Sequence, residues 1–255
     1  GTVTSSGHAA ETLVLFPLMA LGMEVIVSNK LYGGTINLMG KSFRKFGWNA
    51  VFVDNDNPEA FRAAVTENTR AIFVESLANP GGVIVDLEAI AKIAQEAEVP
   101  LIVDNTMATP WLCRPFEWGA DLVVHSTTKF LSGQGNAMGG IVIDSGRFPW
   151  FGNAKYPSLS EPCPDYNGLT FAETFGDMAF TLYSHAVSLR DLGCTQSPMN
   201  AWITLNGVET LPLRMERHVE NAQKVAGFLQ QHPSVEWVSY ACLLYTSDAA
   251  DDDRG

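Results

Sequence analysis

The chain of 255 residues is 46% hydrophobic and carries a formal net charge of −12, from 16 basic and 28 acidic side chains. Its length and apolar content suit one large α/β domain with a sizeable core and argue against a disordered chain. The acidic balance argues against nucleic acid or an anionic membrane as the main partner, because both require a basic face.

The N-terminal segment lacks the basic start of a signal peptide, and the apolar stretch at residues 13–23 is interrupted by Pro17. That stretch is too short to span a bilayer, which needs about 20 residues. The four cysteines form no Cys-x-x-Cys pair, and none has a His at metal spacing. These features predict isolated thiols in a reducing compartment, no metal site and a cytoplasmic location.

Six Val- and Ile-rich runs without polar alternation recur along the chain, which is typical of strands covered on both faces. They lie at residues 24–27, 49–54, 71–74, 101–104, 121–124 and 140–143. Helical patterns separate them, so the predicted fold is α/β, a mostly parallel sheet with helices on both faces. Ligands of such sheets bind at the C-terminal ends of the strands.

The clearest helical pattern covers residues 86–97, where Asp86 can cap the first turn of an apolar stripe. Another helix is expected to begin at Asn57-Pro58, because the missing N–H of Pro58 costs nothing in a first turn. Residues 147–174 are rich in Pro, Gly and aromatic side chains. A long segment of this kind is expected to be functional or to pack against a partner.

Two helical regions are expected beyond this segment, at about residues 175–192 and 207–231. The second carries an apolar stripe, which we expect to lie in the core. Its members are Val219, Ala222, Val225, Ala226 and Leu229. A strand is expected at residues 235–238, after Pro233 has ended the helix.

A hydroxyl-flanked lysine follows the run at residues 121–124, in the sequence Ser126-Thr127-Thr128-Lys129. A lone lysine is usually a solvated charge. This one is expected at the ligand-binding end of a strand, where a desolvated amine becomes a usable nucleophile. Ser126 and Thr128 supply hydroxyls suited to a phosphate beside it. The combination fits a Schiff base with pyridoxal phosphate (PLP).

Four further pieces fall at the same predicted edge of the sheet. Asp104 ends a strand, where a carboxylate can pair with a protonated pyridine nitrogen or simply cap a turn. Tyr32 stands on a Gly-rich turn and can stack on a planar ring. Asn79 follows another strand and can donate to a ring hydroxyl, or belong to a tight turn. The segment Ser6-Gly7-His8 begins a helix, where backbone N–H groups suit a phosphate, although its spacing alone indicates only an N-cap.

Together these pieces resemble the Cys/Met-metabolism family of PLP enzymes, of fold type I, from Ser6 to about Tyr240. The segments at residues 30–35, 166–169 and 211–218 are similar to its O-acetylhomoserine sulfhydrylase branch. Gln134 and Asn167 depart from the family, which often has His at both positions.

The resemblance implies a role for each matching residue. Lys129 matches the Schiff-base lysine that also moves protons, and Asp104 matches the partner of the pyridine nitrogen. Tyr32 matches the ring-stacking tyrosine that assists proton transfer, and Asn79 the residue near the ring hydroxyl and the substrate carboxylate. The expected phosphate ligands are Ser6, Gly7, His8, Ser126 and Thr128.

The resemblance also implies an expected domain organisation. Residues 1–207 match the PLP-binding large domain without its N-terminal arm, and residues 208–241 match the connecting helix and the start of a C-terminal small domain. Residues 242–255 continue no pattern and resemble the translated read-through of a sequencing adapter. We therefore expect a fragment truncated at both ends, with a non-native tail.

The expected activity is γ-replacement on O-acetyl-L-homoserine with sulfide or methanethiol, giving homocysteine or methionine. The alternatives are a methionine γ-lyase or cystathionine γ-synthase type activity, which the same lysine and aspartate would serve, and a PLP-binding fragment without turnover. The family implies a cytoplasmic homotetramer with shared active sites. The charged fraction of only 17% agrees with surface buried between subunits.

Overall fold

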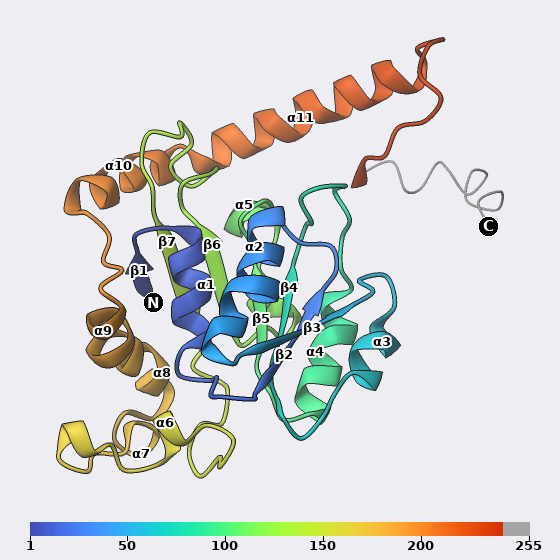
Figure 1. Ribbon diagram of the computed structural model, residues 1–255. Helices are drawn as coiled ribbons and strands as arrows, with labels where there is room; N and C mark the ends of the chain where they lie inside the picture. The colour runs from blue at the N-terminus through green and yellow to red at the C-terminus, as the bar shows by residue number, and fades with distance from the viewer. Residues whose placement is uncertain (242–255) are drawn as a thin grey trace.

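Seven strands form one sheet in the order β1-β7-β6-β5-β4-β2-β3 in the computed structural model, which describes residues 1–241 (Figure 1). Neighbours from β3 through β6 are parallel, whereas β7 and β1 run antiparallel to their neighbours. The predicted, mostly parallel sheet is therefore confirmed. The expected non-native tail and Cys242 lie outside the described residues. The strands are β1 (Thr2–Thr4), β2 (Glu24–Ser28), β3 (Asn49–Val53), β4 (Thr69–Glu75), β5 (Leu101–Asp104), β6 (Leu122–Ser126) and β7 (Gly140–Asp144).

Strand β1 is the one strand that the sequence did not predict. It has three residues, with Thr2 and Thr4 buried and Val3 exposed, so its pattern is too short to stand out. It pairs with β7 and leads directly into the next helix. A Cβ on Gly140 of β7 would lie 2.1 Å from the Ser6 carbonyl oxygen, so a residue without a side chain admits this close approach.

Alternate residues of the buried strands point to two separate cores, as the period of a strand requires. Val27 and Phe73 pack with helix α1 (Gly7–Leu15) on one face. Ile72 and Val103 pack with helix α4 (Leu87–Glu96) on the other. Helices thus cover both faces, which explains why these strands lack polar residues.

The remaining helices connect the strands or follow the sheet (Figure 1). They are α2 (Gly33–Asn37), α3 (Pro58–Ala63), α5 (Thr109–Leu112), α6 (Pro157–Ser160), α7 (Phe171–Phe175), α8 (Ala179–Tyr183), α9 (Arg190–Leu192), α10 (Pro198–Glu209) and α11 (Leu211–Gln230). Short 3₁₀ turns lie at Phe43–Phe46, Pro115–Trp118, Pro164–Tyr166 and Gly176–Met178, and π-helical turns at Leu38–Ser42 and Ser184–Leu189.

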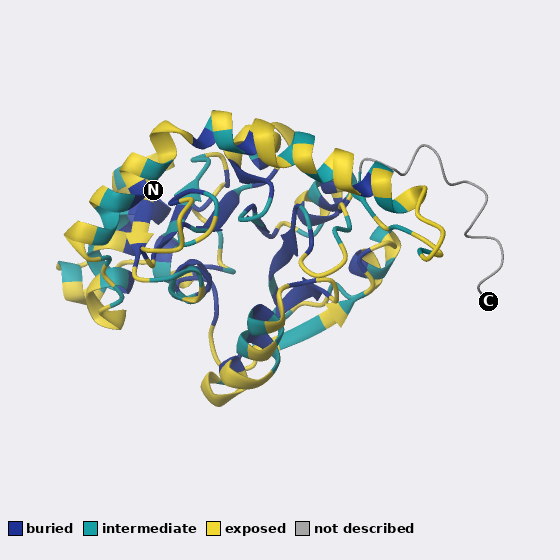
Figure 2. Cartoon of the chain, turned by 90° about the horizontal axis from the view of Figure 1, so that it is seen from above, coloured by how far each residue is buried: buried dark blue, intermediate teal, exposed yellow. Residues whose placement is uncertain are grey.

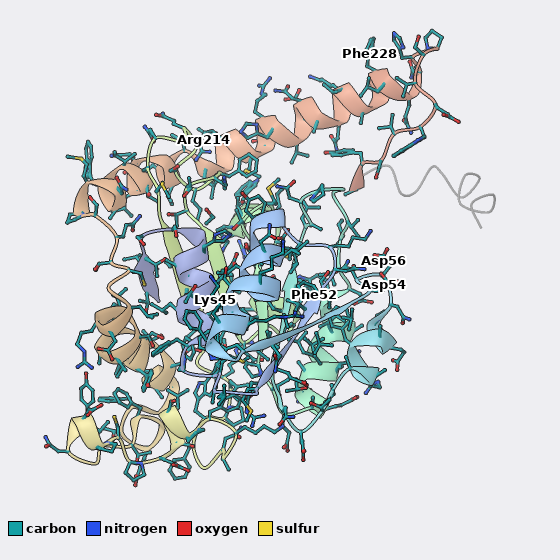
Figure 3. All side chains as sticks on the ribbon, in the orientation of Figure 1. Lys45, Phe52, Asp54, Asp56, Arg214 and Phe228 are labelled. Atoms are coloured by element: carbon teal, nitrogen blue, oxygen red, sulfur yellow. The ribbon has the colours of Figure 1, made fainter. Side chains whose placement is uncertain are left out.

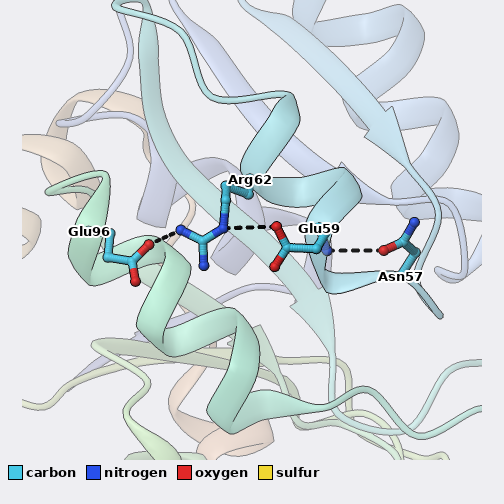
Figure 4. A network of polar contacts seen from close by, with 4 residues as sticks. All are labelled: Asn57, Glu59, Arg62 and Glu96. Atoms are coloured by element: carbon cyan, nitrogen blue, oxygen red, sulfur yellow. Dashed lines mark hydrogen bonds and ion pairs between the residues drawn. The ribbon is translucent and has the colours of Figure 1, made fainter.

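The two predicted helix starts are confirmed by their caps. The Asp86 Oδ1 accepts from the Ala89 N–H at 3.0 Å, and the Asn57 Oδ1 accepts from the Glu59 N–H at 3.1 Å. Arg62 of α3 pairs with Glu59 and reaches Glu96 of α4, which joins the two helices at the surface (Figure 4). These side chains are exposed, so the contacts add little stability.

The aromatic segment at residues 147–174 packs against the chain's own core on the α1 face. Trp150, Tyr156, Phe171 and Phe180 are buried there, and the rings of Trp150 and Phe180 stack at 5.5 Å. The long helix predicted at residues 175–192 is broken instead. Gly176, with φ of 53°, ends α7, and 3₁₀ and π turns separate the pieces that follow.

Helix α11 extends along one end of the molecule and is largely exposed (Figures 1 and 2). Of its predicted core stripe only Ala226 is buried, and Val225 is 56% exposed, so that prediction is wrong. The periodicity identified an apolar face but not what covers it. Residues 235–238 form no strand, which overturns a second prediction. Within the described residues, no helix is long and apolar enough to cross a membrane.

Candidate active site

A cavity of about 290 Å³ opens at the C-terminal ends of the central strands, where the sequence predicted a site. All nine residues predicted for it line this cavity, although they come from five separate segments of the chain. They are Ser6, Gly7, His8, Tyr32, Asn79, Asp104, Ser126, Thr128 and Lys129.

The N-terminus of α1 faces the cavity with free backbone donors. The Ser6 hydroxyl accepts from the Ala9 N–H at 3.1 Å, and the Ser6 carbonyl accepts from the Ala10 N–H at 3.0 Å. The Gly7 and His8 N–H groups therefore have no acceptor within the helix, which makes this end suitable for an anion. Burial lowers the pKa of His8, which favours the neutral form of its imidazole.

Gly7 is fitted against the end of β6. A Cβ at this position would lie 2.7 Å from the Ser126 Cβ and 3.2 Å from the Ser126 Cα, so only glycine allows this approach. Ser126 is itself fixed, because its N–H donates to the Thr106 Oγ1 at 2.7 Å. The helix N-terminus and the Ser126 side chain thus meet at one edge of the cavity.

Thr128 and Lys129 lie on the turn that leaves β6. The Thr128 Oγ1 accepts from the Gly139 N–H at 3.1 Å and donates to the Gly139 carbonyl at 3.3 Å, which ties together the two ends of the loop between β6 and β7. Lys129 lines the cavity but is exposed. The desolvation predicted for its amine is not seen in this chain, because the residue is exposed.

Asp104 ends β5 in the floor of the cavity. Its Oδ1 accepts from the Thr106 N–H at 2.8 Å. Burial raises the pKa of Asp104 in spite of its hydrogen bonds with Thr106, because a charge there is poorly solvated. A cationic partner in the cavity would relieve this cost.

Tyr32 lies beside His8 at the mouth of the cavity, with ring centroids 6.0 Å apart. The tyrosine is 47% exposed, so one face of its ring is available for stacking. A Cβ on Gly34 would lie 2.5 Å from the Tyr32 ring and 2.7 Å from the His8 Nε2. The second glycine of the Gly-Gly turn therefore makes room for both rings.

Two buried carboxyl groups of the cavity were missed by the sequence analysis. Glu75 ends β4, and its two oxygens accept from the Tyr32 N–H at 2.5 Å and the Asn79 N–H at 3.0 Å. Glu11 is only 3% exposed, and its Oε1 accepts from the Thr35 Oγ1 at 2.8 Å. Burial, followed by the nearby Asp104, raises the pKa of Glu11.

These carboxyl groups position the residues that line the cavity. Glu75 fixes the backbone of Tyr32 and Asn79, and Glu11 joins α1 to α2. A sequence signal existed for Glu11: it lies four residues after Gly7, so the two share one face of α1. Acidic side chains are mostly exposed, which is why a helical Glu is ordinarily read as a solvated charge.

We expect Glu75 to make the stability of the chain depend on pH. Burial raises its pKa from 4.5 to about 7 in the folded chain, so the folded state holds the proton more tightly than the unfolded state. Its contribution is complete below pH 4.5 and is lost as the pH rises through about 7. The difference amounts to about 3 kcal/mol.

Chemical denaturation of the Glu75→Gln variant at several pH values measures this contribution. Between pH 4.5 and pH 8 its unfolding free energy should fall by about 3 kcal/mol less than that of the unsubstituted chain. Glu209→Gln, at an exposed position on α10, is the matched control. Parallel pH profiles for the Glu75→Gln variant and the unsubstituted chain would contradict the assignment.

Comparison with protein families and curated proteins identifies relatives of this chain. The profile of the family described as Cys/Met metabolism PLP-dependent enzyme matches residues 1–250. An O-acetyl-L-homoserine sulfhydrylase of Leptospira meyeri is 51% identical over 248 residues, covering 94% of this chain and 56% of that protein. A Thermus thermophilus protein of the same name is 45% identical over 242 residues. The chain thus spans little more than half the length of these curated relatives.

Solved structures agree with these matches. A Campylobacter jejuni protein described as a putative O-acetylhomoserine (thiol)-lyase, with N'-pyridoxyl-lysine-5'-monophosphate, superposes with a TM-score of 0.92 at 40% identity, over 96% of this chain and 60% of its own. A cystathionine γ-lyase of Lactobacillus plantarum gives a TM-score of 0.75 at 31% identity, over 93% of this chain and 54% of its own. The predicted fold type is therefore confirmed.

Proposed function

This chain belongs to the Cys/Met metabolism PLP-dependent enzymes, and on that premise we propose that the cavity at the ends of β4, β5 and β6 binds pyridoxal 5'-phosphate as the centre of a transferase. The observation that carries the proposal is the meeting of a helix N-terminus with free N–H donors, the Asp104 carboxyl and a lysine in one cavity. A phosphate, a pyridine nitrogen and an aldehyde require these three partners.

The donors and acceptors of the cavity fit this cofactor. The N–H groups of Gly7 and His8 and the Ser126 hydroxyl would hold the phosphate, with Ser6 ordering the helix end. The Thr128 hydroxyl would join them by turning its hydrogen from the Gly139 carbonyl, 3.3 Å away, to the phosphate. Asp104 would face the ring nitrogen, whose positive charge removes the penalty of burying a carboxylate there. Tyr32 would stack on the ring, and Asn79 would lie near the ring hydroxyl.

When bound, PLP supplies an electron-poor ring that stabilises negative charge at the α-carbon of an amino acid. Lys129 would hold the cofactor through its Nζ and, once displaced by the substrate amine, take the α-proton on the same atom. Tyr32, at the open mouth of the cavity, would assist proton transfer. Asp104 would keep a negative charge against the ring nitrogen throughout.

We propose γ-replacement on O-acetyl-L-homoserine as the reaction of the whole protein. Acetate leaves from the γ-carbon, and sulfide or methanethiol adds in its place to give homocysteine or methionine. Relatives at 45–51% identity carry the name O-acetyl-L-homoserine sulfhydrylase, whereas the cystathionine γ-lyase structure is 31% identical. That difference favours replacement over elimination or cystathionine synthesis.

Product analysis tests this reaction in the full-length protein. With O-acetylhomoserine and sulfide, homocysteine and acetate should form in equal amounts, and without sulfide little acetate should be released. Release of ammonia and a 2-oxo acid at the same rate with and without sulfide would instead identify a γ-lyase. Cystathionine formed on addition of cysteine would identify the synthase.

The 255-residue chain itself is proposed to bind PLP without turnover, since it spans about half the length of its relatives. Addition of PLP to the purified chain tests this, because covalent attachment to a lysine gives a visible absorbance band. We also propose a cytoplasmic location and a homotetramer with shared active sites for the whole protein. Sedimentation of the full-length protein measures the second.

A further inference from the structure

Arg214 lies on the first turns of α11 (Figure 3). It contacts the turn that carries Lys129, eighty-five positions earlier in the chain. Its Nη1 donates to the Phe130 carbonyl at 2.8 Å, and its Nη2 donates to the Gly207 carbonyl at 2.6 Å. Its Nε donates to the Thr210 Oγ1 at 3.1 Å. A permanently charged planar guanidinium therefore binds the lysine turn and the end of α10 together.

Two glycines leave the space for this contact. A Cβ on Gly133, whose φ is 80°, would lie 2.5 Å from the Arg214 Cζ. A Cβ on Gly207 of α10 would lie 2.2 Å from the Ser132 carbonyl oxygen and 2.6 Å from that of Leu131. The turn is thus enclosed by the backbone of α10 and by the Arg214 guanidinium.

Apolar contacts support the same junction. Leu131 of the turn is buried with Leu211 and Met215 of α11 in a separate small cluster. The ring of Phe130 packs against that of His218 at 5.2 Å. Helix α11 therefore contacts the lysine turn through both a charge-assisted hydrogen bond and an apolar cluster.

We propose that Arg214 is the positioning residue for Lys129, coupling α11 to the active site. The Lys129 side chain is exposed, so the place of its amine depends on its backbone. That backbone is held by the Gly133 N–H, which donates to the Lys129 carbonyl at 2.8 Å, and by Arg214 on the adjacent Phe130 carbonyl. The inference rests on the proposed function in taking Lys129 as the cofactor-bearing residue.

The coupling has a mechanical consequence. Most of α11 is exposed in this chain, and two of its three buried residues, Leu211 and Met215, lie at its N-terminal end beside Arg214. A displacement of that end would withdraw the guanidinium from Phe130 and loosen the lysine turn, which would then be held by its internal bonds from Ser132 and Gly133. The position of α11 and the reactivity of Lys129 are therefore linked.

Two measurements on Arg214→Ala test the proposal. The first is hydrogen exchange at the amides of residues 129–139, which needs no cofactor. The second is the rate at which PLP attaches to Lys129, measured by trapping the product with borohydride, which reports the reactivity of the lysine. We expect exchange to become about tenfold faster and attachment about tenfold slower, because the variant loses the charge-assisted hydrogen bond to the Phe130 carbonyl together with those to α10. Added guanidinium should restore part of the attachment rate, and R214K should give an intermediate rate.

The matched control is Arg217→Ala, one turn further along α11. Within the described part of the chain, the exposed Arg217 side chain forms an ion pair with Glu220 alone, at 3.4 Å. It should leave both measurements unchanged. Hydrogen exchange in β4 and β5 reports global unfolding. If the Arg214→Ala variant unfolds, R214K takes its place in both measurements. Equal exchange of the turn in the Arg214 and Arg217 variants overturns the proposal, as does faster exchange with an unchanged attachment rate. Failure of the unsubstituted chain to attach PLP contradicts the proposed function instead, and exchange alone then decides.

Discussion

Replacement of Lys129 by alanine is expected to abolish covalent attachment of PLP and to lower turnover of the full-length protein by about 10³-fold or more. The variant removes the amine of the cavity turn and leaves the Ser126 and Gly7 contacts of the predicted phosphate site in place. PLP should therefore still bind, but reversibly. Visible absorbance and mass analysis after borohydride reduction measure attachment, and fluorescence quenching measures the remaining affinity.

Lys92→Ala is the matched control, because Lys92 is exposed on α4 and, among residues 1–241, forms an ion pair with Glu88 alone, across one helical turn. It should attach PLP like the unsubstituted chain. If the Lys129→Ala chain retained a reducible bond to PLP at another lysine, the assignment of Lys129 would be wrong. The cavity would then bind the phosphate of PLP, while the PLP aldehyde would react with a different lysine.

The sheet was predictable because its signal is local. Each run of Val and Ile must be covered on both faces, and residues such as Val27 and Ile72 report this without any knowledge of their neighbours. Strand β1 was missed because three residues at an antiparallel edge carry no such run. The strand depends on the distant Gly140, because a residue without a side chain at this position lets the Ser6 backbone lie close to β7.

The cavity was predictable because Tyr32, Asn79, Asp104 and Lys129 each follow or end a predicted strand, and parallel strands end at one edge. What the residues do once there depended on tertiary contacts. Thr128 is engaged with Gly139, Lys129 is exposed, and Glu75 is buried under the backbone of Tyr32. None of these properties follows from spacing, because each depends on how the chain packs around the residue.

In helix α11 too, the sequence predicted the element but not its tertiary contacts. Its apolar periodicity correctly identified a helix and a face, but burial requires a second surface, and Val225 has none in this chain. The contact between α11 and the lysine turn is made by the charged Arg214 and not by the predicted apolar stripe. Arg214 reaches the lysine turn because Gly133 and Gly207 have no side chains that would block the contact. A helical pattern in the sequence carries no information about such a long-range contact.

A methyl group on Gly7 is expected to disrupt the predicted phosphate site, even though the change is the smallest possible. The added Cβ of the Gly7→Ala variant would lie 2.7 Å from the Ser126 Cβ, so α1 must move away from β6. Overpacking of this kind costs about 1–3 kcal/mol of unfolding free energy. PLP affinity should fall at least about tenfold, because the Gly7 and His8 N–H groups no longer converge with the Ser126 hydroxyl.

Gly227→Ala separates this effect from the loss of a glycine as such. Gly227 lies in α11, where a Cβ would meet nothing within 4 Å, so alanine should stabilise the helix by up to about 1 kcal/mol and leave PLP affinity unchanged. Fluorescence titration with PLP and thermal unfolding measure both quantities on the two variants. A Gly7→Ala chain that bound PLP as tightly as the Gly227→Ala chain would place the phosphate away from the α1 N-terminus. Reduced stability with unchanged affinity would mean that the close contact with Ser126 serves the fold alone.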